Sequence, residues 1–110
     1  MIELFLLLVG CHLIADFALQ DTFVAVNKAR GGPNKAPWWY VLFAHAGIHG
    51  TLVGLVTGYW FIGLAEAACH WITDHIKCEG LIGFKTDQFI HIVCKVIWTV
   101  FAVQLGIWWF

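Results

Sequence analysis

Four long apolar stretches alternate with short polar ones along the chain. Two segments rich in Gly, Pro, Asn and Lys, at 27–37 and 77–86, interrupt the apolar pattern, and a weaker break lies at 57–60. Such residues are typical of helix ends and turns. The breaks leave four stretches, at about 2–22, 37–58, 59–78 and 86–110. Each is about the 20 residues that a helix needs to cross the hydrocarbon core of a bilayer. The pattern therefore predicts an all-α fold, a bundle of four transmembrane helices, in a single domain over residues 1–110.

The composition favours lipid over water as the solvent. Hydrophobic residues make up 61% of the chain and charged residues only 12%, with a mean hydropathy of +0.80. Soluble domains are about 45–50% apolar and about 25% charged. The net charge of -1 is spread without acidic or basic runs, so nothing indicates a nucleic-acid partner. We expect the lipid bilayer itself to be the main partner.

The basic residues predict an orientation. Four spans would place the loops at 27–36 and 77–85 on the same side of the membrane. These loops hold five of the six positive charges, Lys28, Arg30, Lys35, Lys77 and Lys85. Because cytoplasmic loops are enriched in Lys and Arg, we expect both loops in the cytoplasm and both termini outside, in the inner cell membrane. The aromatic segments 37–41 and 108–110 would then be anchors at opposite interfaces.

The second stretch carries a ridge of small residues. Ala46, Gly50, Gly54 and Gly58 recur every four residues, so they lie on one helix face. Small side chains allow another helix to approach closely. We expect this ridge to pack inside the bundle. The alternative is a homo-oligomer formed through the face of Gly50, Gly54 and Gly58.

Each stretch also carries polar residues four positions apart, which places them on one helical face. They are His12, Asp16 and Gln20; His45 and His49; Glu66, His70 and Asp74; and Asp87, His91 and Lys95. On otherwise apolar helices, four such stripes must face one another. At about 1.5 Å of rise per residue, they fall into two adjacent layers in the half of the bundle nearest the basic loops.

Ionisable side chains in hydrocarbon need a physical reason. On insertion scales, each costs about 2.5–3.5 kcal/mol, so such residues indicate function by default. A divalent transition metal would stabilise the carboxylates as anions and keep the imidazoles neutral. Zinc, iron and manganese all suit imidazole with carboxylate. The predicted metal ligands are His12, His45, His49, His70, Asp74 and His91.

The other polar residues receive separate roles. Asp16 and Glu66 are the candidate catalytic carboxylates, with Asp16 as a general base for water. Lys95 is a counter-charge or an anion binder. Lys28, with the loop lysines Lys77 and Lys85, is expected to attract an anionic lipid head group.

These roles describe a membrane-embedded metallohydrolase that acts at the cytoplasmic leaflet, on a phosphate-bearing or ester-bearing lipid. Several alternatives stay open. The stripes also suit a proton or ion relay, a haem-binding electron carrier with histidine ligands, or a phage accessory protein that acts on the host membrane. In the last case, hydrogen bonds between His and Asp or Glu would serve assembly only.

Four motifs carry a family resemblance. They are HLIADFALQ at 12–20, followed by Asn27 and Lys28; HAGIHG at 45–50; HWITDHIKC at 70–78; and TDQFIHI at 86–92. On these motifs the chain resembles the domain of unknown function 3307 family of small phage and bacterial integral membrane proteins. The resemblance implies a membrane protein with several spans, found in prokaryotes and their viruses.

Overall fold

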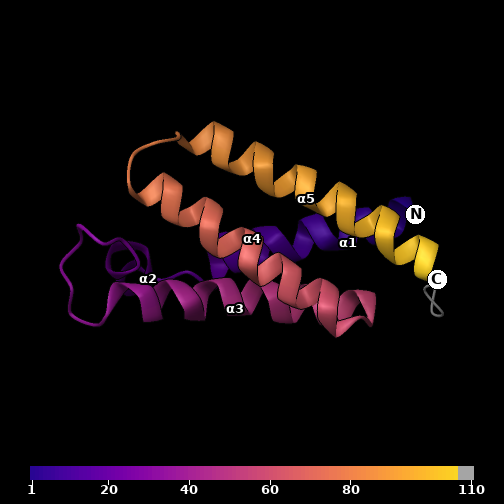
Figure 1. Cartoon of the computed structure of the whole chain (residues 1–110), viewed down its shortest axis with the longest axis horizontal. Helices are drawn as coiled ribbons and strands as arrows, with labels where there is room; N and C mark the ends of the chain where they lie inside the picture. Colours follow the sequence, from indigo (N-terminus) through magenta and orange to yellow (C-terminus); the bar gives the residue numbers. More distant parts are fainter. Residues whose placement is uncertain (107–110) are drawn as a thin grey trace.

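Helices are the only regular secondary structure in the region that the structure, a computed structural model, describes. That region is residues 1–106, and it contains no strand. The elements are α1 (Ile2–Leu13), the π-helical turn η1 (Ile14–Ala18), α2 (Thr22–Asn27), α3 (Trp38–Thr57), α4 (Trp60–Cys78) and α5 (Phe84–Leu105). The body is elongated, 44 × 23 × 21 Å, and the long helices follow its long axis (Figure 1). The all-α prediction is confirmed.

The helix limits agree with the predicted stretches except at the start of the chain. α3, α4 and α5 begin and end close to the breaks read from the sequence. The first helix, however, ends with η1 at Ala18, and a separate short helix, α2, follows. Asp21 caps α2, since its Oδ1 accepts a hydrogen bond of 2.9 Å from the backbone N–H of Val24. The expected anchor at 108–110 lies outside the described residues.

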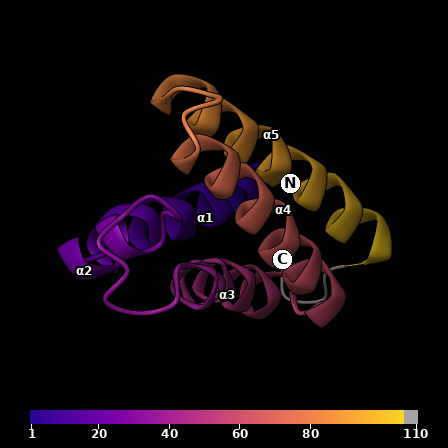
Figure 2. The same cartoon turned by 60° about the vertical axis from the view of Figure 1, so that its left-hand side comes forward.

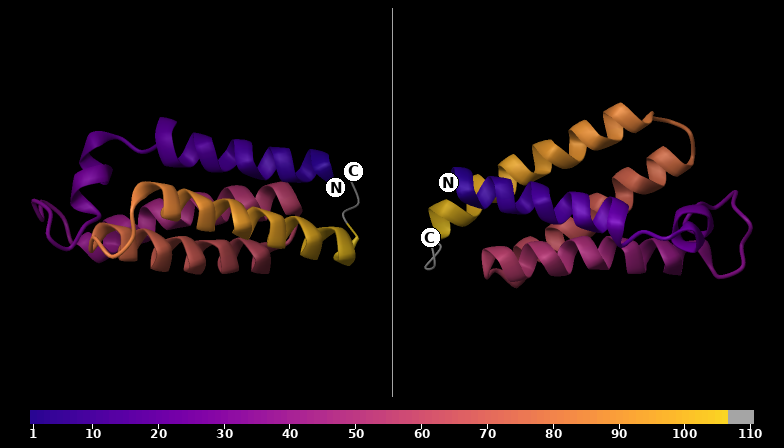
Figure 3. Two further views of the ribbon diagram at one scale, coloured as in Figure 1. Left: turned by 90° about the horizontal axis from the view of Figure 1, so that it is seen from above. Right: turned by 180° about the vertical axis from the view of Figure 1, so that it is seen from behind.

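Four helices form a ring in cross-section. α1 contacts α3 and α5, and α4 contacts the same two helices, so α1 and α4 lie across the ring from each other (Figure 2). The loops that follow α2 and α4 lie at one end of the body. The N-terminus, the turn between α3 and α4, and the end of α5 lie at the other end (Figures 1 and 3). The basic loops therefore share one end, which we call the loop end.

The distribution of side chains is inverted relative to a water-soluble protein. Within residues 1–106, the buried set holds nine hydrophobic and fifteen polar or charged residues, whereas twenty-nine large hydrophobic side chains are exposed. By length and composition, two helices, α3 and α5, are able to cross a membrane. α4 carries three charged residues, Glu66, Asp74 and Lys77, and α1 has only 12 residues before η1 begins.

The small-residue ridge brings α3 and α4 into close contact. A Cβ atom added at Gly50 would lie 2.5 Å from the carbonyl oxygen of Gly63 and 2.8 Å from Cβ of Ala67. Gly54 faces Gly63 in the same contact. Gly58 has a different role, because it ends α3 with a left-handed φ of 77°. The ridge thus packs against α4 at Gly50 and Gly54, as expected for the first of its two uses, and a homo-oligomer through this face stays a prediction.

This contact generates a prediction for Gly50→Ala. The added methyl group must push apart two backbones, so we expect a loss of about 1–3 kcal/mol in the free energy of unfolding. Unfolding of the detergent-solubilised protein with increasing denaturant measures it. Gly47→Ala on the same helix is the control, since no described atom lies within 4 Å of its added Cβ. Equal stability of the two variants would contradict the packing.

Candidate metal centre

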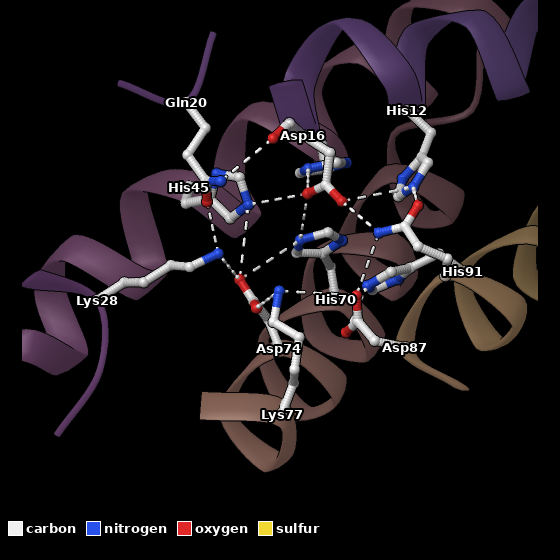
Figure 4. Close-up of polar contacts among 12 residues, drawn as sticks. His12, Asp16, Gln20, Lys28, His45, His70, Asp74, Lys77, Asp87 and His91 are labelled. Carbon is white, nitrogen blue, oxygen red and sulfur yellow. Dashed lines mark hydrogen bonds and ion pairs between the residues drawn. The ribbon is translucent and has the colours of Figure 1, made fainter. Parts of the chain in front are cut away.

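The buried polar residues form three tiers along the bundle. On α4 the tiers are marked by Asp74, His70 and Glu66, which are one turn apart and so separated by about 6 Å. We call them the outer tier, nearest the loop end, the middle tier and the inner tier. In Figure 4, side chains from η1 and all four long helices point toward one another in the outer and middle tiers.

The middle tier is built around one carboxylate oxygen. Asp16 Oδ1 lies 3.2 Å from His45 Nε2, 3.2 Å from His49 Nε2 and 3.7 Å from His70 Nε2. One ligand atom from each of these four residues lies within 4.8 Å of the other three. All four side chains are buried, and Asp16 is the most exposed at 7%. We call this group the first cluster.

Local backbone structure places these side chains. Asp16 sits in η1, where the backbone N–H of Leu19 bonds to the carbonyl oxygen of Ile14 at 2.9 Å and widens the helical turn. Single π turns inside helices are frequent at functional sites. On the other side, the close contact at Gly50 stacks the rings of His49 and His70, with centroids 3.6 Å apart. The first cluster therefore depends on a wide turn in one helix and close packing of two others.

Three imidazoles form a second cluster beside the first. His12, His70 and His91 each offer one ligand atom within 4.8 Å of the others. The rings of His70 and His91 are stacked with centroids 4.2 Å apart. His12 and His91 have ring centroids 5.0 Å apart. His70 belongs to both clusters, so five histidines from α1, α3, α4 and α5 share the middle tier.

Gln88 links the two clusters and is absent from the sequence-based set. Its Nε2 donates to Asp16 Oδ2 at 2.8 Å and to Asp87 Oδ2 at 3.2 Å. Its Oε1 lies 3.0 Å from His12 Nε2. The four-residue spacing of Asp87, His91 and Lys95 does not include this position. A search for three-residue spacing would have found it, because Gln88 precedes His91 by three.

The outer tier is a set of ion pairs. Lys28 Nζ donates to Asp74 Oδ2 at 2.6 Å and also to Gln20 Oε1. Lys77 Nζ lies 3.0 Å from Asp74 Oδ1 and 3.7 Å from Asp87 Oδ2. Lys28, considered from sequence as a binder of lipid head groups, is thus buried and paired inside the bundle. The reason is that its side chain turns from the loop toward the buried carboxylate of Asp74.

Asp74 lies next to the first cluster without joining it. Its Oδ2 is 3.6 Å from His45 Nε2 and 3.9 Å from His70 Nε2. Because the same oxygen accepts the Lys28 hydrogen bond, this carboxylate is already engaged. Of the six predicted metal ligands, the five histidines lie in the two clusters and Asp74 lies at their outer edge.

The inner tier is a second ion pair. Glu66 Oε1 accepts from Lys95 Nζ at 2.7 Å, and Glu66 Oε2 accepts from Trp98 Nε1. Both Glu66 and Lys95 are 1% exposed. Glu66, considered from sequence as a catalytic carboxylate, has both oxygens occupied and lies outside the two clusters. Lys95 is its counter-charge.

Asp16 differs from the other carboxylates of the three tiers. Asp74, Asp87 and Glu66 each have a lysine within ion-pair distance. Among residues 1–106, the only ion-pair partners of Asp16 are histidines. A buried carboxylate needs a cation or several hydrogen bonds to offset its desolvation. The middle tier therefore lacks a permanent positive charge where it most needs one.

Several ring nitrogens of the imidazoles also lack hydrogen-bond partners. Within the described residues, His49 Nε2, both ring nitrogens of His70 and His91 Nε2 are buried without a hydrogen-bond partner. Each such group costs about 1–3 kcal/mol when left unpaired. A cation that binds their lone pairs removes this cost. The donor set thus has the chemistry of a metal site.

The distances also fit one ion. For metal–ligand bonds of about 2.0–2.1 Å, two ligands of a tetrahedral zinc lie about 3.3–3.4 Å apart. The three separations from Asp16 Oδ1 to the imidazole nitrogens, 3.2, 3.2 and 3.7 Å, bracket that value. The first cluster would hold such an ion with small side-chain adjustments.

The bridging position of Gln88 generates a prediction for Gln88→Leu. Loss of the bonds that orient Asp16 and His12 is expected to weaken zinc affinity about 10–100-fold, the usual effect of removing support for metal ligands. Competition with a chromophoric chelator measures the affinity of the solubilised protein. Gln104→Leu, an exposed position on the same helix, is the matched control. Unchanged affinity in Gln88→Leu would remove Gln88 from the site.

The match to a known family covers this entire core. Residues 4–109 match the family described as "Protein of unknown function (DUF3307)". No curated protein and no solved structure matches the chain. The matched range includes all four long helices of the ring, apart from the first two residues of α1, and every residue of both clusters. The chain therefore belongs to the DUF3307 family.

Proposed function

We propose that this chain is an integral membrane protein with four spans that binds a divalent transition metal in its first cluster. The ligands are Asp16 Oδ1 and the Nε2 atoms of His45, His49 and His70. The observation that carries the proposal is their arrangement: three buried imidazole nitrogens surround one carboxylate oxygen at the separations of a tetrahedral site. That carboxylate has no lysine or arginine partner among residues 1–106.

Zinc fits this donor set best. Three imidazoles and one carboxylate in a tetrahedral arrangement are common for zinc, whereas manganese takes more oxygen ligands in octahedral sites. Non-haem iron sites typically use two histidines and one carboxylate on one face, with open positions. The first cluster instead supplies four donor atoms that all lie within 4.8 Å of one another.

The exposed surface supports the membrane location. Large apolar side chains cover the outside of the helices, and polar side chains fill the inside. The 44 Å length of the body is comparable with the about 40–45 Å of a bilayer with its head groups. Such a surface would aggregate in water, so it fits lipid.

Four spans follow if α4 and α1 cross with their neighbours. α4 does not have the composition of a membrane-spanning helix, because it carries Glu66, Asp74 and Lys77. Glu66 and Asp74, however, are each 1% exposed and form ion pairs inside the ring. Their charges do not meet lipid. α1 and η1 together run from residue 2 to residue 18, which at 1.5 Å per residue is about 25 Å, and exposed residues such as Leu6 and Phe17 give them an apolar outer face.

Metal-assisted hydrolysis at the membrane surface is the second candidate function. The observation that favours it is Asp74, a carboxylate within 3.6 Å of a ligand nitrogen, His45 Nε2, on the loop-end side of the first cluster. In that reaction Asp74 would act as general base after water displaces one of its two lysine partners, Lys28 and Lys77. The exposed Arg30, Lys35 and Lys85 would attract anionic head groups. Four protein ligands fill a tetrahedral zinc site, so metal binding without hydrolysis stays the first proposal.

Metal content tests the first proposal. We expect protein purified without chelator to contain at least about one equivalent of zinc, as a closed four-ligand site does. His45→Ala removes one ligand of the first cluster and is expected to lower the amount of zinc bound in that cluster more than tenfold. Elemental analysis of the solubilised protein measures it. His75→Ala, on α4 but stacked on Trp38 away from the clusters, is the control. Wild-type protein with less than about a tenth of an equivalent would sink the proposal.

The orientation is tested with trypsin. Arg30 and Lys35 lie exposed in the loop between α2 and α3. If this loop is cytoplasmic, as the positive-inside rule predicts, trypsin cuts there in inside-out membrane vesicles and not in intact spheroplasts. Mass spectrometry identifies the cut. The variant Arg30→Gln with Lys35→Gln is the control, because it removes both cleavage sites. Cleavage in spheroplasts alone would reverse the topology.

A further inference from the structure

The second cluster offers ligands for a second metal ion. His12, His70 and His91 come from α1, α4 and α5, and each is at most 2% exposed. Their ligand atoms lie within 4.8 Å of one another. His70 belongs to both clusters and gives its Nε2 to the first. A second cation would therefore have His12 and His91 as its own histidine ligands and would need a further donor beside them.

Hydrogen bonding does not account for this cluster. His91 Nε2, His12 Nδ1 and both nitrogens of His70 are buried and lack hydrogen-bond partners among residues 1–106. Asp87 Oδ1 is also buried without a hydrogen-bond partner in this region, and it lies 3.2 Å from His91 Nε2. That distance is close to the about 3.3 Å expected between two ligands of one tetrahedral ion. The hydrogen bonds of residues 1–106 therefore leave these atoms available to a cation.

Asp16 lies between the two clusters. Its Oδ1 faces the first cluster, whereas its Oδ2 is 3.6 Å from His12 Nε2. Gln88 holds Oδ2 at 2.8 Å and contacts His12 as well. A carboxylate with one oxygen toward each of two sites has the position of a bridging ligand, as found where two metals are about 3.5–4 Å apart.

From these observations we infer that the core is a binuclear centre. The second divalent transition metal binds His12, His91 and the Asp87 carboxylate, while His70 stays on the first ion through Nε2 and Asp16 lies between the two ions. The inference rests on the proposed function, because it places the second ion beside the first. It differs in its residues, since His12 and His91 have no part in the first cluster.

Stoichiometry with cobalt(II) as the probe tests the inference. Metal-free solubilised protein is titrated with cobalt, and bound metal is measured after gel filtration. We expect about two equivalents in the wild type and about one in each of the variants His91→Ala and His45→Ala. His75→Ala is the control and keeps both. One equivalent in the wild type that is lost in His45→Ala but kept in His91→Ala overturns the second site and leaves the first intact.

Other outcomes separate the two proposals. No binding in the wild type ends both. One equivalent that is lost in His91→Ala and kept in His45→Ala overturns the binuclear centre and moves the single ion to the second cluster. If the variants do not fold, cobalt(II) electron paramagnetic resonance on the wild type alone decides. Two ions about 4 Å apart are spin-coupled, so the signal per cobalt falls at the second equivalent, and a signal that stays proportional to bound cobalt overturns the inference.

Discussion

The carboxylate of Asp16 is the group around which the rest of the core is arranged. Removing such an anion from water costs several kcal/mol unless charge or hydrogen bonds replace the hydration. Three imidazoles approach one of its oxygens, and Gln88 and His12 lie at the other. No ammonium group reaches it in the described part of the chain. The π turn, the stacked histidines and Gln88 all serve one requirement, which is to surround this charge with hydrogen-bond donors and, in the proposed site, with a cation.

Helix packing meets that requirement because the core is polar and the outside is apolar. In lipid, apolar side chains gain little by leaving their surroundings, so close packing and polar contacts hold helices together. The contact of Gly50 with Gly63 sets the distance between α3 and α4. The stacking of His49 on His70 follows from that distance. A change in the small-residue ridge would therefore alter the geometry of the centre, even though no glycine touches a ligand atom.

The sequence predicted the helices and the polar stripes, because both depend on periodicity that extends over many residues. It did not predict η1 or α2, which depend on local backbone choices near Asp16 and Asp21. Gln88 was missed because it lies one position from the stripe of its helix. Partner choice was the least predictable feature. Whether Lys28 faces lipid or Asp74 depends on how a loop folds back, and no spacing rule contains that information.

The three tiers explain why the proposed cation site lies in the middle of the stripes and not at their ends. The outer tier pairs Asp74 and Asp87 with Lys28 and Lys77, and the inner tier pairs Glu66 with Lys95. Each of these tiers is neutral without any ligand. The middle tier has the same four-residue spacing but pairs its carboxylate, Asp16, with histidines, whereas the other tiers pair theirs with lysines. Because imidazole binds metals as a neutral ligand and ammonium cannot, this exchange of residue type leaves one negative charge and several free lone pairs at a single level. Lys77, 26% exposed in the outer tier, marks the loop end as the shorter route from solvent to that level.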